Sequence, residues 1–295
     1  MFPTHKIVRM HYTIDRDQSA SMSGAIQDLA YSIKTRRAIL FAGAGLSISV
    51  GLPPWRELII RMGKEFGFDD NVPTHDGRFD YPILAEYFRL KQGSIGPLRS
   101  WMDRNWFVSE QRIQDSVVHE LIVELDFPII YTTNYDRNLE VAYNLHRKEF
   151  VKIVNTRDMT TIEESVTQIV KFHGDFDDDQ SLVVTESDYL NRLSFDSPLD
   201  IKFRADALGR TILFIGYSMR DMNIRLLLHR FWQTWHHSDY EKNRPQSFVF
   251  MINPNPVEEA VLSKWGITVL SEEADSPEQS LLKFLTKLKQ GVEEA

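Results

Sequence analysis

Asn134 and His173 are the side chains whose type and position best suit them to chemistry. Asn134 ends the strand-like run 128–134 in the segment YTTNYDRNLE, where its amide could bind a sugar hydroxyl or a water molecule. His173 follows a similar run in VKFHGDFDD, and an imidazole can take a proton near neutral pH. Both have ordinary alternatives, because Asn is a good capping residue and most histidines are simple surface or core residues.

A glycine-rich turn near the N-terminus has the composition of a binding site for an anionic group. In LFAGAGLSISVGLPPWREL, the Gly-Ala-Gly of residues 43–45 follows an apolar run and precedes Ser47. If a helix begins here, its backbone N–H groups and the positive end of its dipole would face a phosphate. A tight turn needs glycine for backbone reasons as well, so both interpretations stay open. Ile48 stands at the third glycine position of a dinucleotide fingerprint, which disfavours an ordinary hydride-transferring dehydrogenase.

Two further strand ends carry candidate contacts. Gly216 and Ser218 lie at the end of the run 210–218, and Asn253 ends the run 246–253. Glycine would allow close approach of adenosine or phosphate, and Asn253 could bind a ribose hydroxyl. The alternatives are a helix N-cap at Ser218 and a simple turn at Asn253, while Asp136 could simply cap the helix that follows Asn134.

Composition bounds the class of protein. The chain has 295 residues, 42% of them hydrophobic, a formal charge of -8 and no cysteine. Disulfides, a thiolate nucleophile and a Cys-ligated zinc site are therefore excluded, and general affinity for nucleic acid or anionic membranes is disfavoured. The run 177–179 of three aspartates is better explained as a solvated loop than as a metal site, and no ligand set has metal spacing. The sequence lacks an export signal and a 20-residue apolar segment, which predicts a soluble cytoplasmic protein.

The elements that must position these residues alternate between strand and helix. Short β-branched or aromatic runs bounded by turn residues predict strands at 37–43, 128–134, 149–155, 167–174, 210–218, 246–253 and 266–271. Helical patterns occur at 25–35, 55–66, 113–125, 220–235, 257–264 and 277–289. This alternation predicts a doubly wound, mostly parallel α/β sheet of the Rossmann type. In such a sheet, ligands lie outside the carboxyl ends of the strands.

The chain is expected to form one main domain. Residues 24–295 are assigned to it, with a helical insertion at about 64–127 where no strand pattern occurs. Residues 1–23 have the composition of a loosely attached arm.

The order of the motifs resembles the sirtuin family over roughly residues 37–271. The family's Gly-Ala-Gly-x-Ser loop is matched at 43–47. Its Gly-Ile-Pro-Asp-Phe-Arg segment corresponds to Gly-Leu-Pro-Pro-Trp-Arg at 51–56, and its Thr-Gln-Asn-Ile-Asp motif corresponds to Thr-Thr-Asn-Tyr-Asp at 132–136. The His-Gly pair falls at 173–174 and the Gly-Thr-Ser at 216–218. The resemblance implies NAD as ligand and assigns its contacts to Ala42, Gly43, Ala44, Gly45, Ser47, Pro53, Trp55, Arg56, Thr133, Asp136, Gly216, Ser218 and Asn253.

The departures from the family narrow the expected activity. Protein-deacylating sirtuins usually carry a four-cysteine zinc module between the His-Gly and Gly-Thr-Ser motifs, and this chain has no cysteine. It is similar instead to the zinc-less bacterial branch found in anti-phage defence, in which the domain is an NAD hydrolase. That implies NAD as substrate, Asn134 orienting a water or the ribose hydroxyls, and His173 as general base, with no metal. Pro54 replaces the family's acidic residue, so the nicotinamide side of the pocket is expected to differ.

Two other functions and the mode of regulation stay open at this point. An NAD-dependent protein deacylase would use the same NAD site, and a non-catalytic NAD- or ADP-ribose-binding module would bind without turnover. A constitutive NAD hydrolase would poison its host, yet almost the whole chain is assigned to the catalytic fold. We therefore expect gating by assembly, as a homo-oligomer or with a separately encoded sensor or regulatory partner such as an ATPase or a nucleotide-handling subunit.

Overall fold

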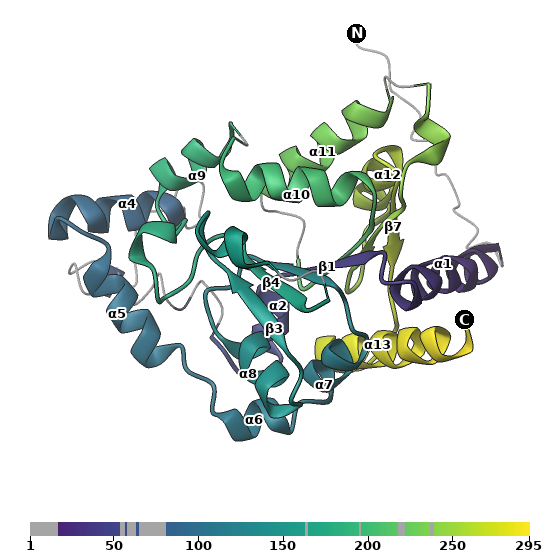
Figure 1. The fold of residues 1–295 in the computed structure, drawn as a ribbon, viewed down its shortest axis with the longest axis horizontal. Coiled ribbons are helices and arrows are strands. Elements are labelled where there is room, and N and C mark those ends of the chain that lie inside the picture. The colour runs from purple at the N-terminus through teal and green to yellow at the C-terminus, as the bar shows by residue number, and fades with distance from the viewer. Residues whose placement is uncertain are drawn as a thin grey trace, which may run out of the picture.

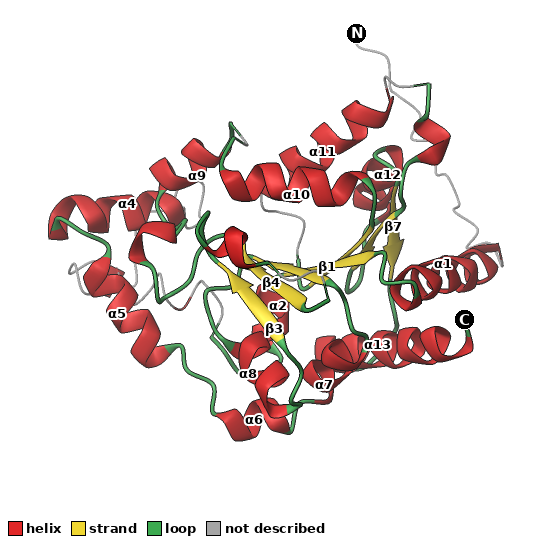
Figure 2. Ribbon diagram, viewed as in Figure 1, coloured by secondary structure: helices red, strands yellow, loops and turns green. Residues whose placement is uncertain are grey.

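A single parallel sheet organises the part of the chain that can be described. The computed structural model describes residues 17–53, 57, 63–64, 81–162, 165–194, 196–217, 222–236 and 239–295. They form a seven-stranded sheet in the order β3-β4-β2-β1-β5-β6-β7, with helices on both faces (Figures 1 and 2). The strands are β1 (Ala38–Ala42), β2 (Ile129–Thr132), β3 (Phe150–Ile153), β4 (Thr167–Lys171), β5 (Thr211–Ile215), β6 (Ser247–Phe250) and β7 (Ile267–Leu270). Each lies within a strand predicted from sequence.

The chain winds in both directions from the central strand β1. It moves from β1 to β2 on one side and later returns to β5 on the other side, and β1 pairs with both. Every neighbouring pair is parallel, so all seven carboxyl ends lie at the same edge of the sheet. This is the topological switch of a doubly wound fold, and the predicted fold class is confirmed.

Helices bury the two faces of the sheet. One face is covered by α1 (Asp17–Lys34), α7 (Val117–Glu124), α8 (Asn138–Leu145) and α13 (Pro277–Glu294), and the other by α10 (Pro198–Leu208), α11 (Met222–His236) and α12 (Pro256–Lys264) (Figure 1). All five residues of β1 are buried, because its side chains alternate between the two helical layers. Ala38, Leu40 and Ala42 face the layer that contains α1, and Ile39 and Phe41 face the layer that contains α10. The Phe41 ring lies 5.1 Å from that of Phe203 on α10, edge to face.

The insertion between β1 and β2 is helical, as predicted. It contains α4 (Tyr81–Gln92), α5 (Gly96–Asn105), α6 (Glu110–Gln114) and α7, and its described residues contain no strand. The pattern at 113–125, predicted as one helix, is divided between α6 and α7. Ser116 stands at the break, where its hydroxyl accepts from the backbone N–H of His119 and caps α7.

The helices at the two ends of the chain differ from the predicted bounds. α1 begins at Asp17, inside the range predicted as an arm, because the polar segment 17–24 gives no apolar periodicity to mark the start of a helix. α1 and α13 lie side by side on one face, where α13 runs to Glu294 (Figure 1). The predicted helix 55–66 lies almost entirely outside the described residues, and α9 (Glu186–Arg192) precedes α10 in the segment between β4 and β5.

Two backbone turns cross in direct contact at the centre of the carboxyl edge. The turn from β1 into α2 (Ala44–Ile48) lies against the turn after β5. A Cβ on Gly43 would lie 2.6 Å from the carbonyl oxygen of Gly216, and a Cβ on Gly45 would lie 2.8 Å from the Gly216 Cα. Gly216 itself has a φ of 77°, which side-chain-bearing residues rarely adopt. Glycine at these three positions is therefore a packing requirement.

We expect Gly216→Ala to lower the free energy of unfolding by about 2 kcal/mol or more, because strain at positive φ adds to a close contact. Urea denaturation measures the change. Gly24→Ala is the matched control, since Gly24 lies within α1 with nothing near its Cβ position. Its replacement should raise stability by up to about 1 kcal/mol through helix propensity. Equal midpoints for the two variants would contradict this account of the crossing.

Candidate active site

The strand register brings Asn134 and His173 to equivalent positions. Thr132 of β2 pairs with Lys171 of β4, and the pairing continues as the Phe172 N–H donates to the Thr132 carbonyl at 2.7 Å. Asn134 and His173 each lie two residues beyond that pair, on adjacent segments that leave the same edge of the sheet. The residues predicted to act together are therefore neighbours in the fold, although they are far apart in sequence.

The carboxamide of Asn134 is held in one orientation. Its Nδ2 donates to the Gly43 carbonyl at 3.1 Å and to the Ser47 hydroxyl at 2.9 Å, and the side chain is only 9% exposed. A carbonyl can only accept, so the bond to Gly43 fixes which end of the amide is NH₂. Both amide hydrogens are thereby used. Among the described residues no donor bonds to Oδ1, which leaves this oxygen as the acceptor for a ligand hydroxyl or water.

Asp136 supports this arrangement from behind. Its Oδ2 accepts from the Ser47 hydroxyl at 2.7 Å, and its Oδ1 accepts from the backbone N–H of Asn138 at 3.1 Å. The second bond satisfies a donor in the first turn of α8, although the N-cap position itself is Arg137, which makes no side-chain cap bond. Both oxygens therefore have partners within the protein, and Asp136, Ser47 and Asn134 form one directed chain of hydrogen bonds.

His173 is buried in an aromatic and cationic surrounding. It is 3% exposed, stacks on Phe172 with ring centroids 6.0 Å apart, and meets Tyr189 edge to face at 5.5 Å. Burial and the positive charge of Arg192 lower the pKa of His173 to about 3. The imidazole is therefore neutral at pH 7, which differs from the expectation of a group that titrates near neutrality.

Gly174 is required by the path of the chain after His173. It has a φ of 94°, and a Cβ there would lie 2.4 Å from the Ser181 carbonyl oxygen. The segment folds back so that the Val183 N–H donates to the His173 carbonyl at 2.9 Å. The His-Gly pair thus fixes the imidazole at the end of β4.

The glycine turn is tied to its neighbour more tightly than predicted. The Gly43 N–H donates to the Ile215 carbonyl at 2.8 Å and the Gly45 N–H to the Gly216 carbonyl at 3.0 Å. These two donors, predicted to face a phosphate, point at the adjacent turn. Tyr217, which the sequence analysis did not single out, shares a 2.8 Å hydrogen bond with the Thr133 hydroxyl and joins the turns after β2 and β5.

The remaining predicted contacts divide into three groups. Ala42 is wholly buried at the end of β1, and Pro53 is partly buried beyond the glycine turn. Asn253 is exposed after β6, with a φ of 50°, and is separated from Asn134 by β1 and β5. Trp55, Arg56 and Ser218 lie outside the described residues.

Sequence reasoning missed two buried ionisable residues beside the site. Lys171, at the end of β4, is wholly buried among acidic groups. His119 on α7 is 1% exposed; its Nδ1 bonds to the Ser116 hydroxyl at 2.9 Å, and its Nε2 is buried without a hydrogen bond. Burial lowers the pKa of His119 to about 4, against the opposing effect of negative Asp136. A lysine at the end of a strand predicted to be buried was the available signal for the first.

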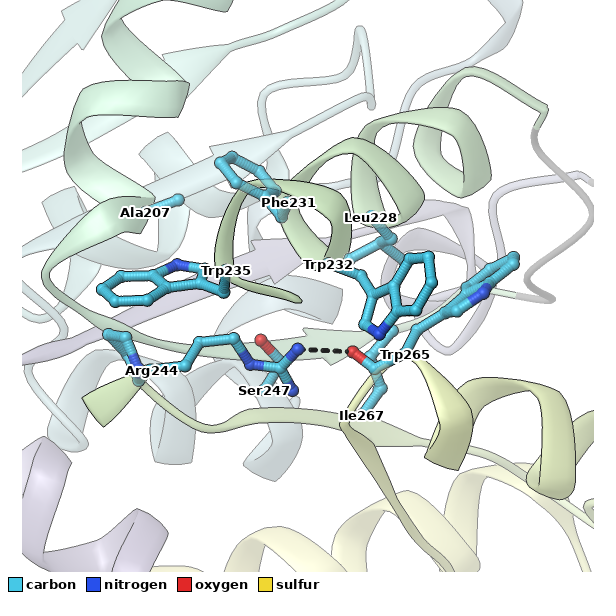
Figure 3. A pocket seen from close by; sticks show the side chains of 10 residues that line it. Ala207, Leu228, Phe231, Trp232, Trp235, Arg244, Ser247, Trp265 and Ile267 are labelled. Carbon is cyan, nitrogen blue, oxygen red and sulfur yellow. Dashed lines mark hydrogen bonds between the residues drawn. The ribbon is translucent and has the colours of Figure 1, made fainter. Parts of the chain in front are cut away.

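An aromatic pocket lies at the opposite edge of the sheet. Its lining includes Ser247 and Ile267, the first residues of β6 and β7, and Figure 3 shows three tryptophans near Arg244. The Arg244 guanidinium donates to the Trp265 carbonyl at 2.8 Å (Figure 3). The cavity of about 20 Å³ has room for about one water molecule. It is too small for a dinucleotide and lies away from Asn134 and His173.

A family model described as SIR2-like domain matches residues 128–270. This segment of the chain is a SIR2-like domain. The match runs from β2 to β7, so it includes Asn134 and His173 but not the glycine turn. The predicted resemblance to the sirtuin family is thereby confirmed.

Curated relatives of this chain come from bacteria. The NAD(+) hydrolase ThsA of Enterococcus faecium is 32% identical over 206 residues, which are 69% of this chain and 41% of the relative. The protein of the same name from Bacillus cereus is 28% identical over 70% of this chain and 42% of the relative. Defense-associated sirtuin 2 of Bacillus subtilis is 22% identical over 80% of this chain and 23% of the relative. The chain thus spans about two-fifths or less of the length of these relatives.

Among solved structures, one of Sir2 covers 90% of this chain at 10% identity with a TM-score of 0.39, which is too low to add to the assignment. Within the described residues, no group of three or more His, Asp or Glu side chains is arranged to hold a metal ion. In the same part of the chain, no helix has the length and apolarity needed to cross a membrane.

The two buried histidines should make the protein sensitive to mild acid. In an unfolded chain a histidine titrates near about pH 6.5, above the folded values for His119 and His173. In that interval the unfolded state binds more protons, so the stability present at neutral pH is lost as the pH falls. We expect the free energy of unfolding to fall by roughly 1 to 2 kcal/mol per histidine between about pH 7 and pH 5.

Urea denaturation at the two pH values measures this loss. His119→Gln removes one of the two groups and should reduce the loss by its share, while the Ser116 side chain keeps a polar neighbour. An identical loss in the wild type and in His119→Gln would contradict the account.

Proposed function

We propose that the protein is an enzyme that hydrolyses NAD at the nicotinamide–ribose bond, giving nicotinamide and ADP-ribose. The strand register, which sets Asn134 and His173 level beside the glycine turn, is the observation that carries the proposal. The names of the ThsA relatives, NAD(+) hydrolase, support it. The absence of cysteine also disfavours the zinc module of protein deacylases.

The reaction needs little acid assistance, because nicotinamide is already a good leaving group. As the glycosidic bond breaks, its electron pair moves to the pyridinium nitrogen, and nicotinamide leaves as a neutral molecule. The ribose carbon becomes oxocarbenium-like, as in glycoside hydrolysis. Water then forms the new C–O bond and gives its proton to a base. The protein must therefore hold the ribose, exclude bulk water and place one water molecule.

Asn134 suits the placement of the ribose or the water. Its two N–H groups are fixed by Gly43 and Ser47, so Oδ1 has a defined direction before substrate arrives. An acceptor held in this way loses little freedom when a hydroxyl binds to it.

His173 suits the role of base, acting through a ribose hydroxyl or the water. Because its pKa is lowered to about 3, it is unprotonated at neutral pH and able to accept a proton. The same burial disfavours the imidazolium, so the accepted proton must pass on to solvent before the next turnover.

The biological role follows from depletion of NAD. Loss of NAD halts an infected cell, and one relative is named as defence-associated. We place this protein as the NAD-depleting effector of an anti-phage system in the cytoplasm, gated by homo-oligomerisation or by a separately encoded sensor or regulatory subunit. Under this proposal, nicotinamide release per monomer rises with protein concentration or on addition of the products of neighbouring genes.

We expect the purified protein to release nicotinamide from NAD with no acylated peptide present. His173→Ala should lower kcat by about 10²-fold or more while NAD still binds, because a general base contributes on this scale. Asn134→Ala should lower kcat similarly. Chromatography of nicotinamide and ADP-ribose measures the rate, and circular dichroism checks that the variants are folded.

Matched control substitutions are available on α8 and at its end. His146→Ala and Asn144→Ala replace the same residue types at the end of α8 away from the site, and should keep wild-type turnover. Release only with an acylated peptide would support the deacylase instead. Saturable NAD binding without product, at any protein concentration and also after addition of the products of neighbouring genes, would contradict the proposal, as would near-wild-type turnover by folded His173→Ala.

A further inference from the structure

Lys171 is a wholly buried charged side chain beside the site, and the proposed mechanism does not use it. It ends β4, two residues before His173, and none of its surface is exposed. Its ammonium group donates to the backbone carbonyl of Asp136. It also lies 3.2 Å from Oε1 of Glu140 on α8 and 3.4 Å from Oδ2 of Asp175.

The acidic partners depend on this lysine for compensation. Both carboxylate oxygens of Glu140 and Oδ2 of Asp175 are buried and make no hydrogen bond, so the facing ammonium balances their charge. Although burial opposes the charged form, the carboxylates of Glu140, Asp175 and Asp136 outweigh it and raise the pKa of Lys171. The lysine is therefore charged at neutral pH.

The contacts of Lys171 connect the two segments that carry the proposed catalytic pair. Asp136 lies two residues after Asn134, in the turn between β2 and α8. Asp175 lies two residues after His173, in the loop that follows β4. One ammonium group thus contacts both segments and the first turns of α8.

A second lysine anchors the same loop from the edge of the sheet. Lys152 of β3 lies 3.3 Å from Oδ1 of Asp175 and 2.7 Å from Oδ2 of Asp177. Asp177 in turn pairs with Arg137, next to Asp136. Asp175 is therefore held from two sides, but among the described residues only Lys171 links it to the backbone of the Asn134 segment.

A buried ion cluster is costly to form and contributes little to stability compared with apolar packing. Its best use is to specify one arrangement of the groups that it joins. We propose that Lys171 is a positioning residue that sets the placement of Asn134 relative to His173 through Asp136 and Asp175. The effect of Lys171 on catalysis rests on the proposed NAD hydrolysis, whereas its tethering of the two segments does not.

The test removes the charge without leaving a carboxylate unpaired. In Lys171→Met/Glu140→Gln the buried volume is nearly kept, and Asp175 retains Lys152 as its partner. We expect a folded protein in which kcat falls by about 10- to 100-fold, since small misplacements have effects of this size. KM for NAD should stay within about twofold, because the binding contacts remain.

Two further readouts separate positioning from a general loss of structure. In the His173→Ala background the double substitution should lower kcat little further, because residues that act as a unit are not additive. Hydrogen exchange should quicken in residues 133–137 and 172–182 and nowhere else. Lys202→Met, which removes a partly buried ion pair with Asp206 on α10, is the control and should change neither kcat nor exchange at these segments.

The outcomes are distinct. Unchanged exchange in both segments, or equal and additive losses of kcat in the wild-type and His173→Ala backgrounds, would overturn the positioning role. A wild-type protein that cleaves no NAD, even with the products of neighbouring genes added, would overturn the proposed function instead, and faster exchange confined to the two segments would still support the tether. If the double variant does not fold, exchange in Lys171→Arg decides the same question, because arginine keeps the charge but not the compact ammonium geometry.

Discussion

The pairing of β4 with β2 is the constraint on which the site depends. Side chains alternate between faces along a strand, so a slip of one residue would exchange the faces of every side chain on β4. With Thr132 opposite Lys171, Lys171 points into the layer of α8 and the chain beyond places His173 level with Asn134. Ile169 and Val170, buried on opposite faces, hold this register through apolar packing. The relative position of the proposed catalytic pair is therefore set by the hydrophobic core.

The carboxyl edge combines polar groups with almost complete burial. Asn134, Ser47 and Asp136 satisfy one another in a single chain of hydrogen bonds, so the Asn134 amide is oriented without help from solvent. His173 is accommodated differently, as a neutral ring among aromatic groups. The glycines of the two crossing turns allow β1 and β5 to end close enough for this arrangement.

Much of this fold can be predicted from sequence because its strands are buried on both faces. Such strands read as short apolar runs between turn residues, and all seven predicted runs contain a strand. The rule that ligands lie at carboxyl strand ends then selects Asn134, His173 and Gly216. The helices are less well marked. The break at Ser116 follows from a side-chain cap, and α1 starts in a polar segment, so apolar periodicity marks neither point.

The parts of the site that sequence could not supply depend on long-range contacts. Nothing in the local pattern shows that Lys171 meets Glu140 and Asp175, or that burial lowers the pKa of His173. The use of the Gly43 and Gly45 N–H groups by the neighbouring turn likewise follows from tertiary packing. The dinucleotide contacts assigned to Trp55, Arg56 and Ser218 stay predictions, as do the partners and the cellular location.

The most direct test of the central claim is a crystal structure with a non-hydrolysable NAD analogue bound. The account predicts that the anomeric carbon on the nicotinamide side lies between Asn134 and His173, with Oδ1 of Asn134 within hydrogen-bonding distance of a ribose hydroxyl or an ordered water. An analogue bound elsewhere, with these two side chains away from its glycosidic bond, would contradict it.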